Sequence, residues 1–323
     1  MFTRKTALIH KENAISELKP IKLGGIQQWI SIRAEDKSKP VLLFLHGGPG
    51  TGQIGIIGDY QKELEKHFIV VNWDQRGAGL SYTKEVAKTE LKIEQLLNDT
   101  LGLINFLKKE FHQEKIYLIG HSWGTILGLL AIHRHPEHFH HYIGISQVIS
   151  MSKIEEVSYE LVLEKAKELN NQKAVTQLTE IGKPPWRNLK HDRIHQRYVD
   201  LFGGGISHNG KLVNTFLKKL LKSKEYTFLD IVRFFKGQYF SLTQLMGEMR
   251  KLDLSEEVQQ LDVPITLIMG RHDLQVPTET ARGWFDSVDA KNKTWVWFEK
   301  SAHSPLFEEN DKFVELVLTQ TQR

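Results

Sequence analysis

The sequence contains no cysteine among its 323 residues. This absence excludes disulfide bonds, thiolate metal sites and a cysteine nucleophile, but it does not identify the cellular compartment. No run of about 18 apolar residues occurs, so no membrane-spanning helix is expected. The N-terminus lacks the long apolar segment of a signal peptide, because charged residues resume at Lys11 and Glu12. The sequence therefore predicts a soluble cytoplasmic protein without a membrane partner.

Clustered positive charge is also missing. The chain has 43 Lys and Arg residues against 39 Asp and Glu residues, a net charge of +4, and the basic residues are scattered along the sequence. This distribution argues against a nucleic-acid partner. Neither a Gly-x-Gly-x-x-Gly segment nor a Gly-Lys-Ser/Thr ending is present, so a phosphate-binding loop is not favoured. The sequence gives no indication of the oligomeric state.

Short apolar segments alternate with helical patterns over most of the chain. Gly24 and Gly25 separate two β-rich runs and predict a hairpin at an antiparallel edge. The alternation predicts an α/β fold with a mostly parallel sheet covered by helices on both faces. The expected strands are 18–23, 27–33, 41–45, 68–73, 115–119, 142–146, 265–270 and 294–298, and helices are expected near 60–66, 97–111 and 311–318.

The alternation stops between residues 147 and 258. Charged helical stretches such as 155–170 and aromatic-rich ones such as 228–245 replace it, and few convincing strands occur. We interpret residues 147–258 as an inserted helical cap, or lid. The core domain would then be discontinuous, formed by residues 1–146 and 259–323.

One pentapeptide carries a strong chemical signal. Residues 120–124 read Gly-His-Ser-Trp-Gly and lie between an expected strand at 115–119 and an expected helix from Trp123 onward. Glycines two places either side of Ser122 let neighbouring backbone approach closely, so the serine hydroxyl would stand exposed above the sheet. An ordinary Gly/Ser turn is the alternative reading of the pentapeptide alone.

A serine nucleophile needs a base and an acid that orients the base. Asp273 follows the expected strand 265–270, and His303 follows the expected strand 294–298. Taken singly, each would be interpreted as a solvated loop residue. Together with Ser122 they occur in the order serine, acid, histidine that accompanies this turn, and each lies at the carboxyl end of a strand, where sites gather.

A glycine-rich loop, residues 46–50, follows the strand 41–45. Glycines allow backbone N–H groups to turn toward a developing negative charge. We expect the amides of Trp123 and Gly48 to form an oxyanion hole, with Gly47 as the alternative to Gly48. Pro49 has no N–H and would only stiffen the loop.

These motifs resemble the α/β-hydrolase superfamily and, within it, the proline iminopeptidases, which are serine aminopeptidases of peptidase family S33. The resemblance rests on residues 46–50, on Asp-Gln-Arg-Gly-Ala-Gly-Leu-Ser at 74–81, on the serine turn and on the Asp273 and His303 loops, and it spans about 15–146 and 258–320. It implies a cofactor-free serine hydrolase that acts on small peptides or amides with a free N-terminal residue, proline first. It also implies that residues 74–81 form a scaffold loop, while Ser122 counts against epoxide hydrolases and haloalkane dehalogenases, which use aspartate there.

The expected cap departs from the family pattern. Better-known proline iminopeptidases carry a Trp-x-x-Trp-Glu motif whose glutamate helps to hold the substrate amine, and here Trp186 is the only tryptophan of the segment. The amine partner is therefore unassigned, and solvated helix faces or packing are alternative roles for every candidate. The candidate substrate-binding residues are Glu155, Glu156, Phe234, Phe235 and Tyr239, with Glu160, Asp230, Glu248 and Phe240 also available.

Five histidines, at positions 133, 135, 138, 140 and 141, form a dense group after the serine turn. Pro136 interrupts their spacing and no acid or cysteine was expected to complete a ligand set, so a solvated surface is favoured and no metal is predicted.

Three other activities stay open for the same fold. A carboxylesterase or lactonase would use the same serine, acid and histidine on a small ester. A carbon-carbon bond hydrolase and a non-catalytic ligand receptor are the remaining alternatives.

Overall fold

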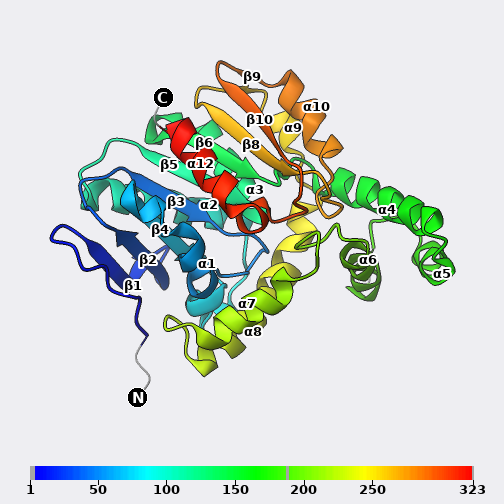
Figure 1. Ribbon diagram of the computed structural model, residues 1–323, viewed down its shortest axis with the longest axis horizontal. Helices are drawn as coiled ribbons and strands as arrows, with labels where there is room; N and C mark the ends of the chain where they lie inside the picture. The colour runs from blue at the N-terminus through cyan, green and yellow to red at the C-terminus, as the bar shows by residue number, and fades with distance from the viewer. Residues whose placement is uncertain (1–3, 187–188, 322–323) are drawn as a thin grey trace.

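An eight-stranded sheet forms the centre of the computed structural model, which describes residues 4–186 and 189–321 (Figure 1). Its strand order is β1-β2-β4-β3-β5-β6-β8-β10. The pairs β1/β2 and β2/β4 are antiparallel and all other pairs are parallel, which confirms the predicted mostly parallel sheet. The strands are β1 (Ile15–Leu23), β2 (Ile26–Ala34), β3 (Val41–Leu45), β4 (Ile69–Asp74), β5 (Ile116–His121), β6 (Phe139–Ile145), β8 (Ile265–Gly270) and β10 (Lys293–Phe298), with a separate pair of β7 (Gln260–Leu261) and β9 (Asp289–Ala290).

Helices cover both faces of the sheet. The central strand β3 is therefore buried on both sides, which explains why its sequence is apolar throughout. Leu43 and Leu45 pack in the core that includes α2 and α3, whereas Leu42 and Phe44 pack in the core that includes α1 and α12. A strand buried on both faces needs apolar residues at every position. The helices outside the β6–β7 connection are α1 (Ile54–Gln61), α2 (Ile93–Glu110), α3 (Trp123–Arg134), α10 (Glu279–Ser287), α11 (Pro305–Glu308) and α12 (Asn310–Thr321).

The helix expected at 60–66 begins earlier than predicted. Helix α1 covers Ile54–Gln61, and only a 3-10 turn, Leu64–Lys66, follows it. The backbone N–H of Ile54 points to the carboxylate of Asp74 at 3.5 Å, and a negative charge at a helix N-terminus is stabilising. Asp74 lies 20 residues away on β4, so the local sequence pattern could not place the start of this helix.

The described residues between β6 and β7 form helices and no strand. We call residues 151–257 the helical insertion. Figure 1 shows α4, α5 and α6 extending from one end of the sheet, whereas α7 and α8 lie together near α1. In the described ranges, no helix combines the length and apolarity needed to cross a membrane. The insertion contains α4 (Met151–Glu168), α5 (Gln172–Ile181), α6 (Leu189–Leu201), α7 (Leu212–Lys222), α8 (Phe228–Met249) and α9 (Leu254–Glu257).

Three polar contacts fix the insertion. Arg250, after α8, forms ion pairs with Glu155 of α4 at 2.7 Å and with Asp192 of α6 at 2.8 Å. The hydroxyl of Tyr226 donates a hydrogen bond to Asp74 at 2.6 Å, which links the insertion to β4. Burial raises the pKa of Asp74 to about 6. These groups connect the helices to one another and to the sheet.

A buried ion pair supports the antiparallel edge. Arg76 donates to both carboxylate oxygens of Asp99 on α2, at 2.7 and 3.0 Å, and both side chains are almost fully buried. Gln28 of β2 donates to the same carboxylate at 2.8 Å, and Arg76 also donates to the carbonyl of Gly24 in the hairpin turn at 2.9 Å. Asp99 therefore holds α2, the hairpin and the segment after β4 together.

We expect Asp99→Ala to lower the free energy of unfolding by about 3–5 kcal/mol, because it leaves the Arg76 guanidinium buried without its counter-charge. Urea unfolding followed by circular dichroism measures this change. The control is Glu90→Ala, since Glu90 pairs with Lys92 in an exposed position and exposed pairs contribute at most about 1 kcal/mol. Equal effects of the two substitutions would contradict the role given to Asp99.

Candidate active site

Ser122 occupies a strained turn between β5 and α3. Its backbone has φ 52° and ψ −118°, a conformation that costs energy for a residue with a side chain. The turn is held by a hydrogen bond from the Ser122 N–H to the carbonyl of Ile145 at 2.9 Å. A Cβ at Gly124 would overlap the carbonyl oxygen of Leu45, so only glycine lets α3 start this close to β3.

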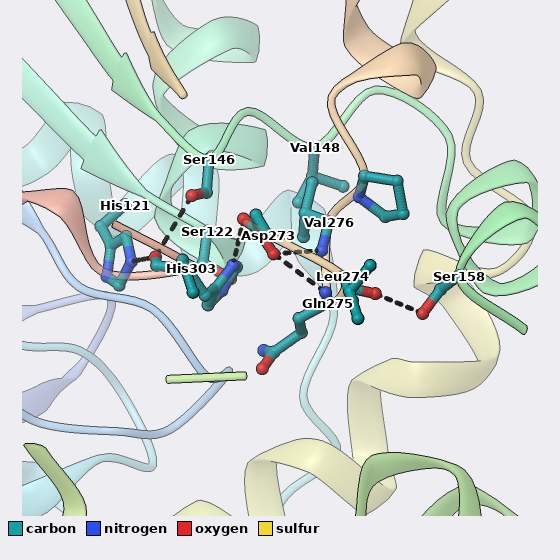
Figure 2. Close-up of polar contacts among 12 residues, drawn as sticks. His121, Ser122, Ser146, Val148, Ser158, Asp273, Leu274, Gln275, Val276 and His303 are labelled. Atoms are coloured by element: carbon teal, nitrogen blue, oxygen red, sulfur yellow. Dashed lines mark hydrogen bonds and ion pairs between the residues drawn. The ribbon is translucent and has the colours of Figure 1, made fainter. Parts of the chain in front are cut away.

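The structure brings the three predicted residues into hydrogen-bond contact. His303 Nε2 lies 2.9 Å from Ser122 Oγ, and His303 Nδ1 lies 2.8 Å from Asp273 Oδ2 (Figure 2). All three side chains are buried. The other carboxylate oxygen of Asp273 accepts hydrogen bonds from the backbone N–H groups of Gln275 at 2.9 Å and Val276 at 2.8 Å. These contacts fix the carboxylate, so Nδ1–H of a neutral His303 can donate to it while Nε2 accepts from the serine hydroxyl.

The backbone of His303 is held from three sides. His121 Nε2–H donates to its carbonyl oxygen at 2.8 Å, and Ser146 Oγ donates to the same oxygen at 3.2 Å (Figure 2). The His303 N–H donates to the carbonyl of Gly205 in the helical insertion at 3.1 Å. Burial and the nearby His303 lower the pKa of His121 to about 3, so His121 is neutral near pH 7. Sequence reasoning missed the roles of His121 and Ser146, although His121 ends β5 and Ser146 directly follows β6.

The glycine-rich loop lies beside Ser122, as the order of motifs predicts. Gly48 has φ 123°, which favours glycine, and a Cβ at Gly47 would lie 3.2 Å from that of Ser122. Within residues 4–186 and 189–321, the backbone N–H groups of Gly48 and Trp123 donate no hydrogen bond. The same is true of Gly47, so the choice between Gly47 and Gly48 as an oxyanion donor stays open.

Gln75 links this loop to Trp123. Its side-chain oxygen accepts from the indole N–H of Trp123 at 2.8 Å, and its side-chain nitrogen donates to the carbonyl of His46 at 3.2 Å. The His46 ring accepts from the Gln75 N–H at 3.1 Å and contacts the Gly47 carbonyl at 2.8 Å. Burial lowers the pKa of His46 to about 4, so the ring is neutral. The segment 74–81 therefore acts as a scaffold, as the resemblance implied.

A cavity of about 480 Å³ opens at Ser122 and His303. Apolar side chains such as Ile154 and Met246 form part of its wall. His195 also lines it and lies against Trp186, with ring centroids 5.0 Å apart, and burial lowers the pKa of His195 to about 4. The size fits a small-molecule or short-peptide ligand.

Two of the five tentative substrate-binding residues line this cavity, Glu155 and Tyr239. The placement of the other three is corrected by the structure. Phe234 is buried against Tyr226 and Phe235 is 50% exposed; neither lines the cavity, and nor does the exposed Glu156. Consecutive helix residues point about 100° apart, and the aromatic pattern alone did not show which direction faces the cavity.

Three carboxylates line the cavity, and they differ in their partners. Glu155 and Asp192 share the guanidinium of Arg250. Asp200, at the end of α6, accepts a hydrogen bond from Gln196 at 3.3 Å, and no basic side chain in the described ranges forms an ion pair with it. Burial raises the pKa of Glu155. Asp200 is thus the cavity carboxylate that has no cationic partner.

Asp200 lies close to the histidine. A Cβ at Gly205 would overlap its carboxylate, and the Gly205 carbonyl accepts the hydrogen bond from His303 N–H. Burial raises the pKa of Asp200, and His303 acts in the opposite direction by stabilising the ionised form. Nothing in the sequence pointed to Asp200, because it lies at a helix end in a segment without a recognised motif.

The expectation that no acid accompanies the histidine group is wrong. The possible ligand atoms of His135, Glu137 and His138 all lie within 4.8 Å of one another. His138 Nδ1 also lies 2.7 Å from the ammonium of Lys108, a positive charge that opposes metal binding there. The absence of a metal stays a prediction.

Residues 36–310 match the profile of the family described as serine aminopeptidase, S33. The chain belongs to this family. It is 37% identical over 311 residues to the probable aminopeptidase YbaC of Bacillus subtilis, covering 96% of this chain and 98% of the relative. It is 25% identical to a proline iminopeptidase of Clostridioides difficile, covering 92% of this chain and 94% of that relative.

Solved structures share the fold. The proline iminopeptidase of Mycobacterium smegmatis superposes with a TM-score of 0.69 at 15% identity, covering 93% of this chain and 96% of that one. VinJ superposes with a TM-score of 0.65 at 18% identity, covering 95% of this chain and 98% of VinJ. The predicted α/β-hydrolase fold and the S33 resemblance are confirmed, and the chain is a hydrolase of this family.

We expect Ser122→Ala to abolish turnover, with a loss of at least about 10⁴-fold in kcat, because in the described residues no other hydroxyl bonds to His303 Nε2. Steady-state kinetics measure the loss, and circular dichroism checks that the variant is folded. The exposed Ser38→Ala serves as the matched control. Retained activity in Ser122→Ala would remove Ser122 from the mechanism.

We expect Gln75→Leu to lower kcat by about 10- to 100-fold with a smaller change in KM, because an oxyanion hole acts on the transition state. Leucine has a similar size but cannot bond to Trp123 and His46. Gln61→Leu is the comparison, since Gln61 is also buried but bonds to Asn72 and does not line the cavity. An equal rise in KM at constant kcat would show that Gln75 acts on substrate binding instead.

Proposed function

We propose that the chain is a serine aminopeptidase that releases an unblocked N-terminal residue from small peptides or amides through an acyl-enzyme. The observation that carries the proposal is a Ser122-His303-Asp273 hydrogen-bond relay opening into a cavity with an unpaired carboxylate, Asp200. The relay supplies a nucleophile, and the carboxylate supplies a partner for a substrate ammonium.

The relay accounts for the covalent steps. As Ser122 Oγ attacks the substrate carbonyl carbon, its proton passes to Nε2 of His303, and Asp273 stabilises the resulting imidazolium. The negative charge on the carbonyl oxygen would be held by the N–H groups of Trp123 and of Gly48 or Gly47. Protonated His303 then donates its proton to the leaving amine. Water, deprotonated by the same histidine, hydrolyses the ester and regenerates Ser122.

The position of Asp200 suits the recognition of an N-terminal residue. In such a substrate, a single carbon separates the free amine from the carbonyl carbon that the serine attacks. The group that binds the amine must therefore lie beside the nucleophile and its base. Asp200 meets this requirement through Gly205, which contacts both its carboxylate and the His303 backbone. A buried ammonium needs such a counter-charge, because an unpaired one is costly.

The other acidic candidates fit this role less well. Glu155 and Asp192 line the cavity, but Arg250 already compensates their charge. Glu156 lies on the exposed face of α4, outside the cavity. We therefore propose that Asp200 binds the substrate amine. Proline is the first N-terminal residue to test, because several relatives of 22–25% identity are named proline iminopeptidases.

We expect a proline-terminated chromogenic amide to be cleaved, and its N-acetylated counterpart to lose at least about tenfold in kcat/KM, because the acetylated nitrogen carries no charge for a carboxylate to bind. A short-chain nitrophenyl ester completes the set. Each is measured with the wild type and with Ser122→Ala. Turnover of the ester alone would favour a carboxylesterase. A non-catalytic receptor would be favoured if the folded wild type cleaved none of the three substrates and did not react with a serine-directed phosphonate.

We expect Asp200→Asn to lower kcat/KM for the free-amine amide by about 10- to 100-fold and to leave the nitrophenyl ester within about twofold, because only the first substrate carries an ammonium. Glu156→Gln is the matched control and should leave both substrates unchanged. An equal loss on amide and ester would assign Asp200 to the His303 loop and not to the amine.

A further inference from the structure

The exposed surface of α7 and α8 is unusually apolar. Eight of the eleven large hydrophobic side chains that are exposed in the described residues lie on these two helices. Phe228 is 74% exposed, Leu229 67% and Leu221 59%. Large apolar patches on a protein surface mark contact sites. The full set is Val213, Leu217, Leu221, Phe228, Leu229, Val232, Phe235 and Tyr239, which we call the apolar stripe.

Helical spacing gathers these side chains on one side of each helix. On α7, Val213, Leu217 and Leu221 are four residues apart. On α8, Phe228, Val232, Phe235 and Tyr239 are separated by four, three and four residues. The opposite side of α8 packs inward through residues such as Phe234 and Leu245, and on α7 the neighbouring Leu220 packs inward beside the exposed side chains. The stripe is therefore a face left over after the insertion has packed, not part of a core.

Between residues 211 and 240, which carry the apolar stripe, the exposed charges have one sign. Outside this range, Asp59 of α1 pairs with Lys219 of α7, and Glu248 near the end of α8 is exposed. Between residues 211 and 240, six basic side chains are exposed and no acidic side chain is. The acids in this range are Glu225, which is partly buried, and Asp230, which is buried and paired with Arg4 and Arg233. The whole chain has a net charge of only +4, so this face is more basic than the rest. The exposed basic residues are Lys211, Lys218, Lys222, Lys224, Arg233 and Lys236.

We propose that α7 and α8 form an interfacial membrane-binding surface that rests on anionic lipid. Amphipathic helices that combine exposed aromatic and aliphatic side chains with lysine and arginine lie in the interface plane of a bilayer. The apolar stripe inserts between the lipid chains, and the basic side chains contact the negatively charged headgroups. A second copy of the chain is a poorer occupant, because it would bring two basic faces together.

The position of this surface relates it to the cavity. Figure 1 shows α7 and α8 together at the lower edge of the molecule, with the sheet above them. Tyr239 belongs to the apolar stripe and also lines the cavity. Phe216 of α7 and Met246 of α8 lie outside the stripe, and they line the cavity as well. Binding through this face therefore places one wall of the cavity next to the lipid.

The test is co-sedimentation of the full chain with vesicles of phosphatidylcholine alone or mixed with phosphatidylglycerol. We expect binding to the phosphatidylglycerol vesicles at low salt, weakened by added salt, and little binding to phosphatidylcholine alone. Leu221→Glu should weaken binding by about tenfold or more, whereas Leu169→Glu, of similar exposure directly after α4, should not. Hydrolysis of a soluble substrate should be the same in both variants.

A second pair of variants tests the charges. Lys218→Glu with Lys222→Glu should remove binding to phosphatidylglycerol vesicles, and Lys291→Glu with Lys300→Glu, which make the same charge change away from α7 and α8, should retain it. Three outcomes would overturn the proposal: failure of the folded wild type to bind anionic vesicles, equal losses in the test and control variants, or a solution dimer that Leu221→Glu splits. The last result would assign the surface to a second copy of the chain.

Discussion

The close contact between the start of α3 and the end of β3 determines the rest of the site. Gly124 lies against the carbonyl of Leu45, and this contact holds Ser122 in its strained conformation at the end of β5. The same contact brings the N–H of Trp123 beside the glycine-rich loop that continues β3. A larger residue at position 124 would separate the two elements and so displace Ser122 and the N–H of Trp123 together.

The sequence alone predicted those parts of the site that depend on the sheet. Ser122, Asp273 and His303 each follow a parallel strand, and parallel strands end at one edge, so their approach could be predicted from their place in the chain. Asp200, Gln75 and Arg250 could not be predicted in the same way. Their roles depend on how a helix end, a loop and the insertion pack in three dimensions, and no periodic pattern encodes that packing.

Within helix α8, too, the sequence pattern could not show which side chains are buried. Phe234 and Phe235 are adjacent in the sequence, yet one is buried and the other is half exposed. The insertion also separates charge in space. Three carboxylates of the insertion line the cavity beside Arg193, and two of them share the guanidinium of Arg250, whereas the exposed charges between residues 211 and 240 are all basic. One segment thus presents mainly acidic groups to a small ligand and a basic surface to a large partner.

The strand order has a consequence for synthesis on the ribosome. Strand β6 pairs with β5 on one side and β8 on the other, and β8 follows the entire insertion in the chain. While residues 151–257 are being translated, β6 is an unprotected edge, and such edges promote association between nascent chains. Helices α4, α5 and α6 pack mainly on one another and can form during this interval. Ser122 is translated well before Asp273 and His303, so its contact with His303 forms only when the last two strands join the sheet.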